Sequence, residues 1–174
     1  MLYSFIRNIK TKIQDMKTIS NLCLGAEKYA NQYNEEKPGA EHFMLASLDL
    51  KDESVRNVFA RLGVNPDEIN QAIIKQHTEA LAGIGIEQEA IIAQTILSEK
   101  IKPSVKLYDT KPSGQFVMQK IYQNNKSRGT RLMGVHVIEA ILSMEYGIAI
   151  RALQAMNIDL IALQKSVETE CNYM

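Results

Sequence analysis

The sequence predicts an all-α protein: two tandem four-helix repeats with pseudo-two-fold symmetry, plus an extra N-terminal helix and a linker helix. Only 9 glycines and 4 prolines occur among the 174 residues, too few turn formers for an all-β protein. Apolar residues recur at helical spacing through most of the chain, as amphipathic helices require. A shift of 94 residues superposes two stretches with the same core and helix-end pattern. The length favours a single domain over residues 1–174.

An extra amphipathic helix is expected over residues 1–17. Its apolar face holds six residues: Leu2, Phe5, Ile6, Ile9, Ile13 and Met16. Basic residues lie between them: Arg7, Lys10, Lys12 and Lys17. The pattern favours packing of the apolar face on the rest of the protein, and docking to a membrane surface or a partner is the alternative. In a docking role the contacts are expected from Leu2, Phe5, Ile6 and Ile9.

The first repeat is assigned to residues 18–77. Its first helix is expected over about residues 18–34, followed by the charged triplet Glu35-Glu36-Lys37, which predicts a solvated loop. A second helix is expected from Ala40 or Glu41, because the run that follows is too continuously apolar to face water.

The remaining two helices of this repeat are marked by their ends. The third is expected to end at Gly63, the residue best suited to the left-handed conformation past a helix terminus. Asn65 can cap the fourth helix, and Pro66 suits its first position.

A connector is assigned to residues 78–111 and the second repeat to residues 112–171. The connector is expected to contain a linker helix from Glu87 to about Lys100. Four helices are then expected over residues 116–125, 132–144, 148–156 and 160–170.

The repeat itself rests on matches in both core and helix ends. The shift places His42 on His136, Gly63 on Asn157, and Asn65 on Asp159. Asn is the next-best residue for the left-handed position after Gly, and Asp caps as well as Asn. Because burial and capping constrain different residues, agreement in both favours a duplicated unit.

The sequence predicts no enzyme, no cofactor and no metal site. It contains no phosphate-binding loop, no dinucleotide fingerprint and no His-Glu-x-x-His motif. The two cysteines, Cys23 and Cys171, lie far apart and outside any Cys-x-x-Cys spacing. His42 and His136 lack acidic or cysteine partners at ligand spacing, so structural roles near a helix start are expected for both.

Charge and hydropathy limit the partners. The formal net charge is zero, which gives no overall drive toward nucleic acid. The chain has no apolar run of the roughly 18 residues that a membrane span needs, so a cytoplasmic protein is expected and a membrane partner is not.

Two segments of the first repeat carry a family resemblance. These are Gly39-Ala40-Glu41-His42-Phe43-Met44-Leu45-Ala46-Ser47-Leu48 and Val58-Phe59-Ala60-Arg61-Leu62-Gly63-Val64-Asn65. Together they resemble the signature of the N-terminal domain of Clp-type AAA+ protein unfoldases, here without the ATPase modules. The resemblance covers roughly residues 18–171, and the second repeat matches less well. It implies two tandem four-helix repeats and a docking module that receives adaptors and substrate segments.

What the resemblance implies is a non-catalytic protein- or peptide-binding protein, an adaptor or accessory factor of a Clp-type protease. Clp ATPase or peptidase subunits, or substrate peptides, are then the expected partners. In some members an acidic residue before the His and a Thr at the start of each repeat bind phosphorylated arginine. Glu41 matches the first acid and Thr110 approximately matches the second Thr, whereas Val135 and Met16 stand at the other two positions. A paired phosphoarginine site is therefore not expected.

Two other functions are compatible with the residues. A helical small-ligand or metal-binding protein could use Glu41, His42 and His136 together. An adaptor anchored to a membrane surface could use the basic leading helix.

Overall fold

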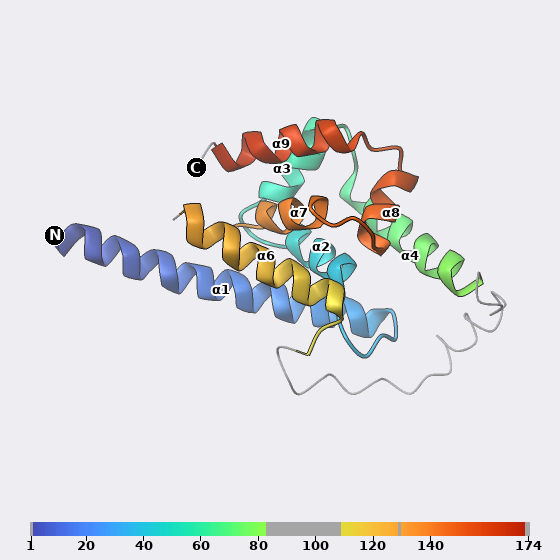
Figure 1. Ribbon diagram of the computed structural model, residues 1–174, viewed down its shortest axis with the longest axis horizontal. Helices are drawn as coiled ribbons and strands as arrows, with labels where there is room; N and C mark the ends of the chain where they lie inside the picture. The colour runs from blue at the N-terminus through green and yellow to red at the C-terminus, as the bar shows by residue number, and fades with distance from the viewer. Residues whose placement is uncertain (1, 83–108, 129, 173–174) are drawn as a thin grey trace.

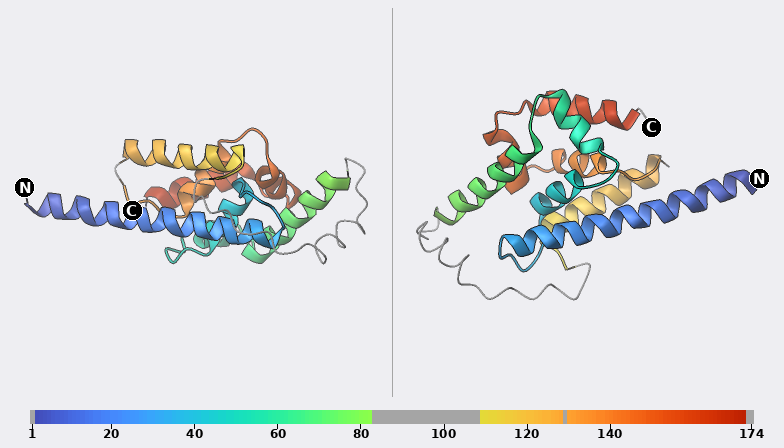
Figure 2. Two further views of the ribbon diagram at one scale, coloured as in Figure 1. Left: turned by 90° about the horizontal axis from the view of Figure 1, so that it is seen from below. Right: turned by 180° about the vertical axis from the view of Figure 1, so that it is seen from behind.

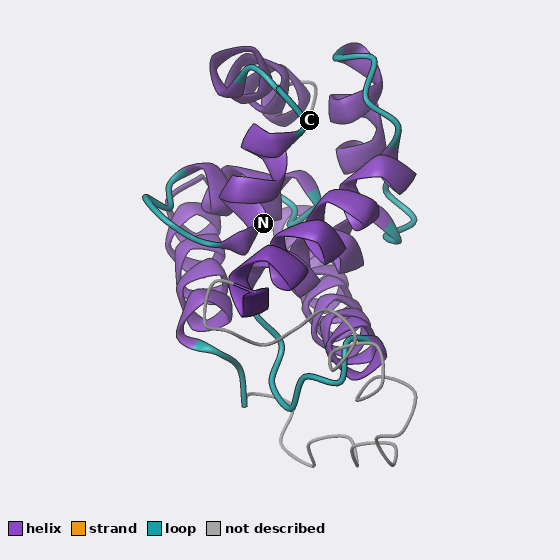
Figure 3. Ribbon diagram, turned by 90° about the vertical axis from the view of Figure 1, so that its right-hand side faces the viewer, coloured by secondary structure: helices purple, strands orange, loops and turns teal. Residues whose placement is uncertain are grey.

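The computed structural model describes residues 2–82, 109–128 and 130–172, and within these ranges it is all-α (Figures 1 and 3). The helices are α1 (Leu2–Gln32), α2 (Ala40–Leu48), α3 (Ser54–Arg61), α4 (Pro66–Ala82), α6 (Pro112–Arg128), α7 (Val135–Leu142), α8 (Ile148–Ala155) and α9 (Leu160–Asn172). The all-α prediction is confirmed. The linker helix predicted from Glu87 to about Lys100 lies outside the described residues.

The N-terminal helix differs from the prediction. Residues 1–17 and 18–34 were expected to form two helices, but α1 runs without a break from Leu2 to Gln32. The reason is local, because the junction Met16-Lys17-Thr18 holds neither Gly nor Pro, and nothing there competes with the helical backbone. Its N-terminal end projects past the other helices in all three views of Figures 1 and 2.

The core is organised around α2 and α7, which pack against each other. All nine residues of α2 are buried, as are six residues of α7. Such helices, apolar on nearly every side, are stable only when other helices surround them. Helix α1 covers α2, and α6 covers α7 (Figure 2). Helices α3, α4, α8 and α9 cover the opposite side.

Several of the packed helix pairs follow the 94-residue shift. The shift converts α1, α2, α3 and α4 into α6, α7, α8 and α9. The packed pair α4–α8 then has α9–α3 as its counterpart, and α2–α8 has α7–α3. Two units related by a two-fold axis through the α2–α7 contact would pair in this way, although the tandem repeat itself stays a prediction.

Local geometry also recurs at this shift. Gly63 has a φ of +67° and Asn157 a φ of +55°, the left-handed conformation predicted for both. The Asn65 side chain accepts a hydrogen bond from the Asp67 N–H at 3.1 Å. Asp159 accepts the corresponding bond from Ile161 at 2.9 Å. Helices α4 and α9 therefore begin with the same type of side-chain cap.

The match is not complete. Leu22 is fully buried, whereas Phe116, its counterpart under the shift, is 38% exposed. Helix α6 therefore presents a different face to the core at this position. Cys23 lies in the core, and burial followed by the charge of Glu27 raises the pKa of its thiol.

Contacts between the two halves are polar as well as apolar. The Ser166 hydroxyl on α9 donates to the Val58 carbonyl on α3 at 3.1 Å, and Asn57 donates to Glu170 at 3.2 Å. Arg61 forms an ion pair with the same Glu170. These bonds join α3 to α9 across the halves.

No described helix is both long and apolar enough to span a membrane.

Close packing of α1 on α2 yields a first prediction. A Cβ atom at Gly25 would lie 2.8 Å from the Ala46 Cβ, so Gly25→Ala is expected to push the two helices apart. We expect a loss of roughly 1–2 kcal/mol in the free energy of unfolding, measured with urea, because the clash exceeds the gain in helix propensity. Gly25→Ala combined with Ala46→Gly should recover part of this loss. A stabilising effect of Gly25→Ala alone would contradict the close approach.

Candidate functional site

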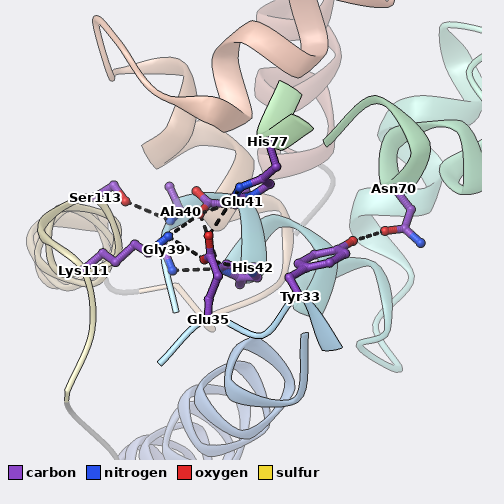
Figure 4. A network of polar contacts seen from close by, with 10 residues as sticks. All are labelled: Tyr33, Glu35, Gly39, Ala40, Glu41, His42, Asn70, His77, Lys111 and Ser113. Atoms are coloured by element: carbon purple, nitrogen blue, oxygen red, sulfur yellow. Dashed lines mark hydrogen bonds and ion pairs between the residues drawn. The ribbon is translucent and has the colours of Figure 1, made fainter. Parts of the chain in front are cut away.

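A cluster of charged and polar side chains gathers at the N-terminus of α2 (Figure 4). We call it the polar cluster; its members are Glu35, Glu41, His42, His77 and Lys111. They come from four places in the chain: the loop after α1, the first turn of α2, helix α4, and the residue before α6. One ligand-type atom from each of the two glutamates and two histidines lies within 4.8 Å of the others.

Local backbone geometry places Glu41 in the polar cluster. Gly39 precedes α2 in an extended conformation, with φ −108° and ψ −175°. A Cβ atom at Gly39 would lie 2.5 Å from the Glu41 Oε1, so the missing side chain leaves room for the carboxylate. The Ala40 N–H donates to the Ser113 hydroxyl at 3.2 Å, which ties this helix start to α6.

His42 has its ring fixed by the backbone. Its Nδ1 accepts a hydrogen bond from the Gly39 N–H at 2.9 Å, and the side chain is fully buried. We assign the tautomer from this bond: a neutral ring that accepts at Nδ1 carries its proton on Nε2. Burial, followed by the positive charge of Lys111 and the neighbouring His77, lowers the pKa of His42 to about 3. The ring is therefore neutral at pH 7.

His136 makes the same local bond in the second half. Its Nδ1 accepts from the Met133 N–H at 3.0 Å, and the ring is almost fully buried. In both halves a histidine near the start of a central helix satisfies a backbone N–H just before that helix. His136 lies outside the polar cluster, so the structure does not bring Glu41, His42 and His136 together as one site.

The two carboxylates of the polar cluster differ in their partners. Glu35 forms an ion pair with Lys111 and lies 3.3 Å from His77 Nδ1. Glu41 is 2% exposed, and its Oε1 receives no hydrogen bond. The nearest cation to that oxygen is the Lys111 ammonium at 3.6 Å. Glu41 is thus a buried carboxylate with one poorly satisfied oxygen.

Tyr33 borders the polar cluster. Its hydroxyl donates to Asn70, and its ring lies 5.5 Å from the His42 ring and 5.8 Å from the His77 ring. Burial, followed by the charges of Glu35 and Glu41, raises the pKa of Tyr33 to about 12. The hydroxyl therefore stays protonated beside the carboxylates.

The sequence-predicted contact residues fall in two places. Glu41 is in the polar cluster, and Thr110 precedes Lys111 and is 8% exposed. Neither side chain is presented on the surface. Ile9 is on the projecting part of α1 and is 43% exposed. The same helix contains Leu2, Phe5 and Ile6, whose side chains are not among those that the structure describes.

The projecting part of α1, residues 2–17, is called the arm. We expected its apolar stripe to pack on the protein, and for the described side chains this is wrong: Ile13 is 50% and Met16 71% exposed, in addition to Ile9. A different face of the arm contacts the rest of the protein, which we call the body. There, Asp15 accepts hydrogen bonds from the Leu132 N–H at 2.8 Å and from the Asn125 amide at 3.3 Å.

Three members of the polar cluster were not predicted. Glu35 was assigned to a solvated loop, which is wrong because its carboxylate contacts Lys111 and both histidines of the cluster. His77 and Lys111 reach the cluster only through the packing of α4 and α6 around the start of α2. The sequence separations leave no short motif to detect. The sequence offered one signal: Glu35, Glu41 and His77 each lie close to an end of a predicted helix.

Comparison with known proteins identifies no family: no family model matches the chain, and no curated protein matches it.

Proposed function

We propose that this protein is a non-catalytic docking module that binds another polypeptide, as a cytoplasmic adaptor or accessory factor of a Clp-type protease or unfoldase. The Clp assignment is supported by the resemblance of the first repeat to the unfoldase N-terminal domain. The docking role depends on one observation, the apolar stripe that the arm turns to solvent. Ile9, Ile13 and Met16 form its described part.

The direction of this stripe supports docking. At 3.6 residues per turn, its centre lies roughly 100° or more around α1 from the buried face formed by Thr18, Leu22 and Ala26. The same helix therefore has two apolar faces that point in different directions. The first belongs to the core of the protein, and the second is free to bury against a partner.

Charge on the arm specifies the chemistry of the partner. Lys12 lies along one edge of the stripe, and Lys10 and Lys17 lie along the other; all three are exposed. Asp15, the acidic residue of this segment, is turned to the body and bonded there. A second copy of the arm would place lysine against lysine. A partner with an apolar groove and an acidic rim fits the arm better, in the helix-in-groove mode of recognition.

The test is the triple variant Ile9→Ser, Ile13→Ser, Met16→Ser, titrated against the Clp ATPase and peptidase subunits of the same cell. We expect affinity to fall by about 100-fold or more, because each apolar side chain buried in a groove contributes roughly 1.5–3 kcal/mol. The melting temperature should stay nearly constant, since these side chains do not enter the core.

Ile161→Ser is the matched control. Ile161 is 68% exposed on α9, so its replacement removes an exposed isoleucine without altering the arm and should leave affinity unchanged. Equal binding by the triple variant and the wild type would refute docking through the arm. Absence of binding to any Clp subunit would refute the Clp assignment. Binding of the arm to anionic vesicles alone would reassign the stripe to a membrane surface.

A further inference from the structure

Three buried atoms of the polar cluster lack hydrogen-bond partners: Glu41 Oε1, His42 Nε2 and His77 Nε2. Two of them, Glu41 Oε1 and His77 Nε2, lie 3.9 Å apart. Leaving such atoms unsatisfied costs roughly 1–3 kcal/mol each. Glu41 is also almost completely buried, so water cannot compensate its carboxylate fully. One divalent cation between the two atoms would satisfy both.

The ring proton of His77 is placed suitably for coordination. Its Nδ1 lies 3.3 Å from Glu35 Oε1, and an N–H directed there leaves the lone pair of Nε2 facing Glu41. Metal-binding histidines usually donate their other ring nitrogen to a carboxylate in this way. His42 has the opposite tautomer, since Gly39 donates to its Nδ1. It is therefore a supporting group, with Nε2 3.4 Å from Glu35 Oε2, and not a metal ligand.

Lys111 occupies the cation position in the structure described. Its ammonium pairs with Glu35 and lies 3.6 Å from Glu41 Oε1. Its side chain is one-third exposed, so it can leave toward solvent without disturbing the core. Ammonium and metal would compete for the Glu41 carboxylate.

We propose that the polar cluster binds a divalent transition metal, Zn²⁺ being the best match, with Glu41 and His77 as ligands, Glu35 accepting the other ring N–H of His77, and with displacement of Lys111. Ligands of tetrahedral zinc at about 2.0–2.2 Å are separated from one another by roughly 3.3–3.6 Å. The observed separation of 3.9 Å between Glu41 Oε1 and His77 Nε2 requires only a small inward shift. A mixed imidazole and carboxylate set favours zinc over magnesium or calcium, which prefer oxygen ligands alone.

The proposal is tested by titrating the full chain with ZnCl₂ in a calorimeter, after treatment with a chelator. We expect one zinc per chain and a higher melting temperature with zinc than without it. Glu41→Gln and His77→Gln should each weaken zinc binding by at least about 10-fold. Lys111→Met should strengthen it, because the competing cation is removed.

Glu36→Gln is the control. Glu36 is exposed and next to Glu35 in sequence, so its loss should leave zinc affinity unchanged. The Lys111→Met result keeps the test decisive even where a ligand variant folds poorly. The proposal is overturned by a wild type that binds no stoichiometric zinc, by binding retained in both ligand variants, or by a Lys111→Met variant that binds no tighter than the wild type.

Discussion

The free energy of unfolding is expected to fall steeply as the pH drops below 6.5, and His42 is expected to supply most of the fall. In the folded protein its pKa is lowered from 6.5 to about 3. The unfolded chain takes up this proton near pH 6.5, whereas the folded chain does not until near pH 3. Between these values the unfolded state binds more protons, so stability falls by up to roughly 1.4 kcal/mol per pH unit. Above pH 6.5 His42 makes no pH-dependent contribution.

The measurement is urea denaturation at several pH values in the presence of a chelator, for the wild type and for His42→Gln. Glutamine can accept the Gly39 N–H from the same helix position but does not titrate. For this variant, the free energy of unfolding should therefore change less with pH between pH 6.5 and pH 4. Below about pH 4 carboxylates begin to titrate as well. Parallel curves for the two proteins would show that the folded state tolerates a charged His42.

Asp52→Ala is expected to be the most damaging single change on the α2–α3 loop. The Asp52 carboxylate accepts the Gly134 N–H at 3.0 Å and the Ser54 hydroxyl at 2.7 Å. Ser54 in turn accepts the Val135 N–H at 2.9 Å. These two residues of the first half thus satisfy backbone groups at the start of α7 in the second half. Their loss leaves buried N–H groups unpaired, and we expect a cost of about 2–3 kcal/mol.

Asp52→Asn should cost less, because an amide oxygen can still accept one of these bonds. Asp49→Ala is the control on the same loop: its carboxylate is exposed and accepts one hydrogen bond from Tyr29, so the expected loss is below about 1 kcal/mol. Chemical denaturation of the three variants checks the order. A loss for Asp52→Ala no larger than for Asp49→Ala would mean that water replaces the carboxylate at α7.

Helices and their ends could be predicted because their causes are local. Gly63 and Asn157 take positive φ since few other residues tolerate it, and Asn65 and Asp159 cap because their short side chains reach the first backbone N–H groups. The run after Ala40 predicted a core helix, and every residue of α2 is buried. Where a boundary has no such residue, as between Lys17 and Thr18, the sequence predicted a break that is not there.

The polar cluster could not be predicted because its causes are not local. Glu35 and Lys111 are 76 residues apart in the chain, and His77 belongs to a third segment. A charged residue in a loop is typical of solvent exposure, and only the packing of α4 and α6 around α2 shows that Glu35 is partly buried. The outward direction of Ile13 and Met16 was missed for a related reason. Spacing identifies an apolar face but not what that face contacts.

The unbroken α1 helix also fixes a distance within the molecule. Its 31 residues correspond to roughly 46 Å at about 1.5 Å per residue. The arm lies at one end, and the loop that carries Glu35 leaves the other. A partner seated on the arm is therefore held at a set span and orientation from the charged residues at the far end, as on a rigid spacer. Dyes attached at the two ends of α1 would report a single narrow separation.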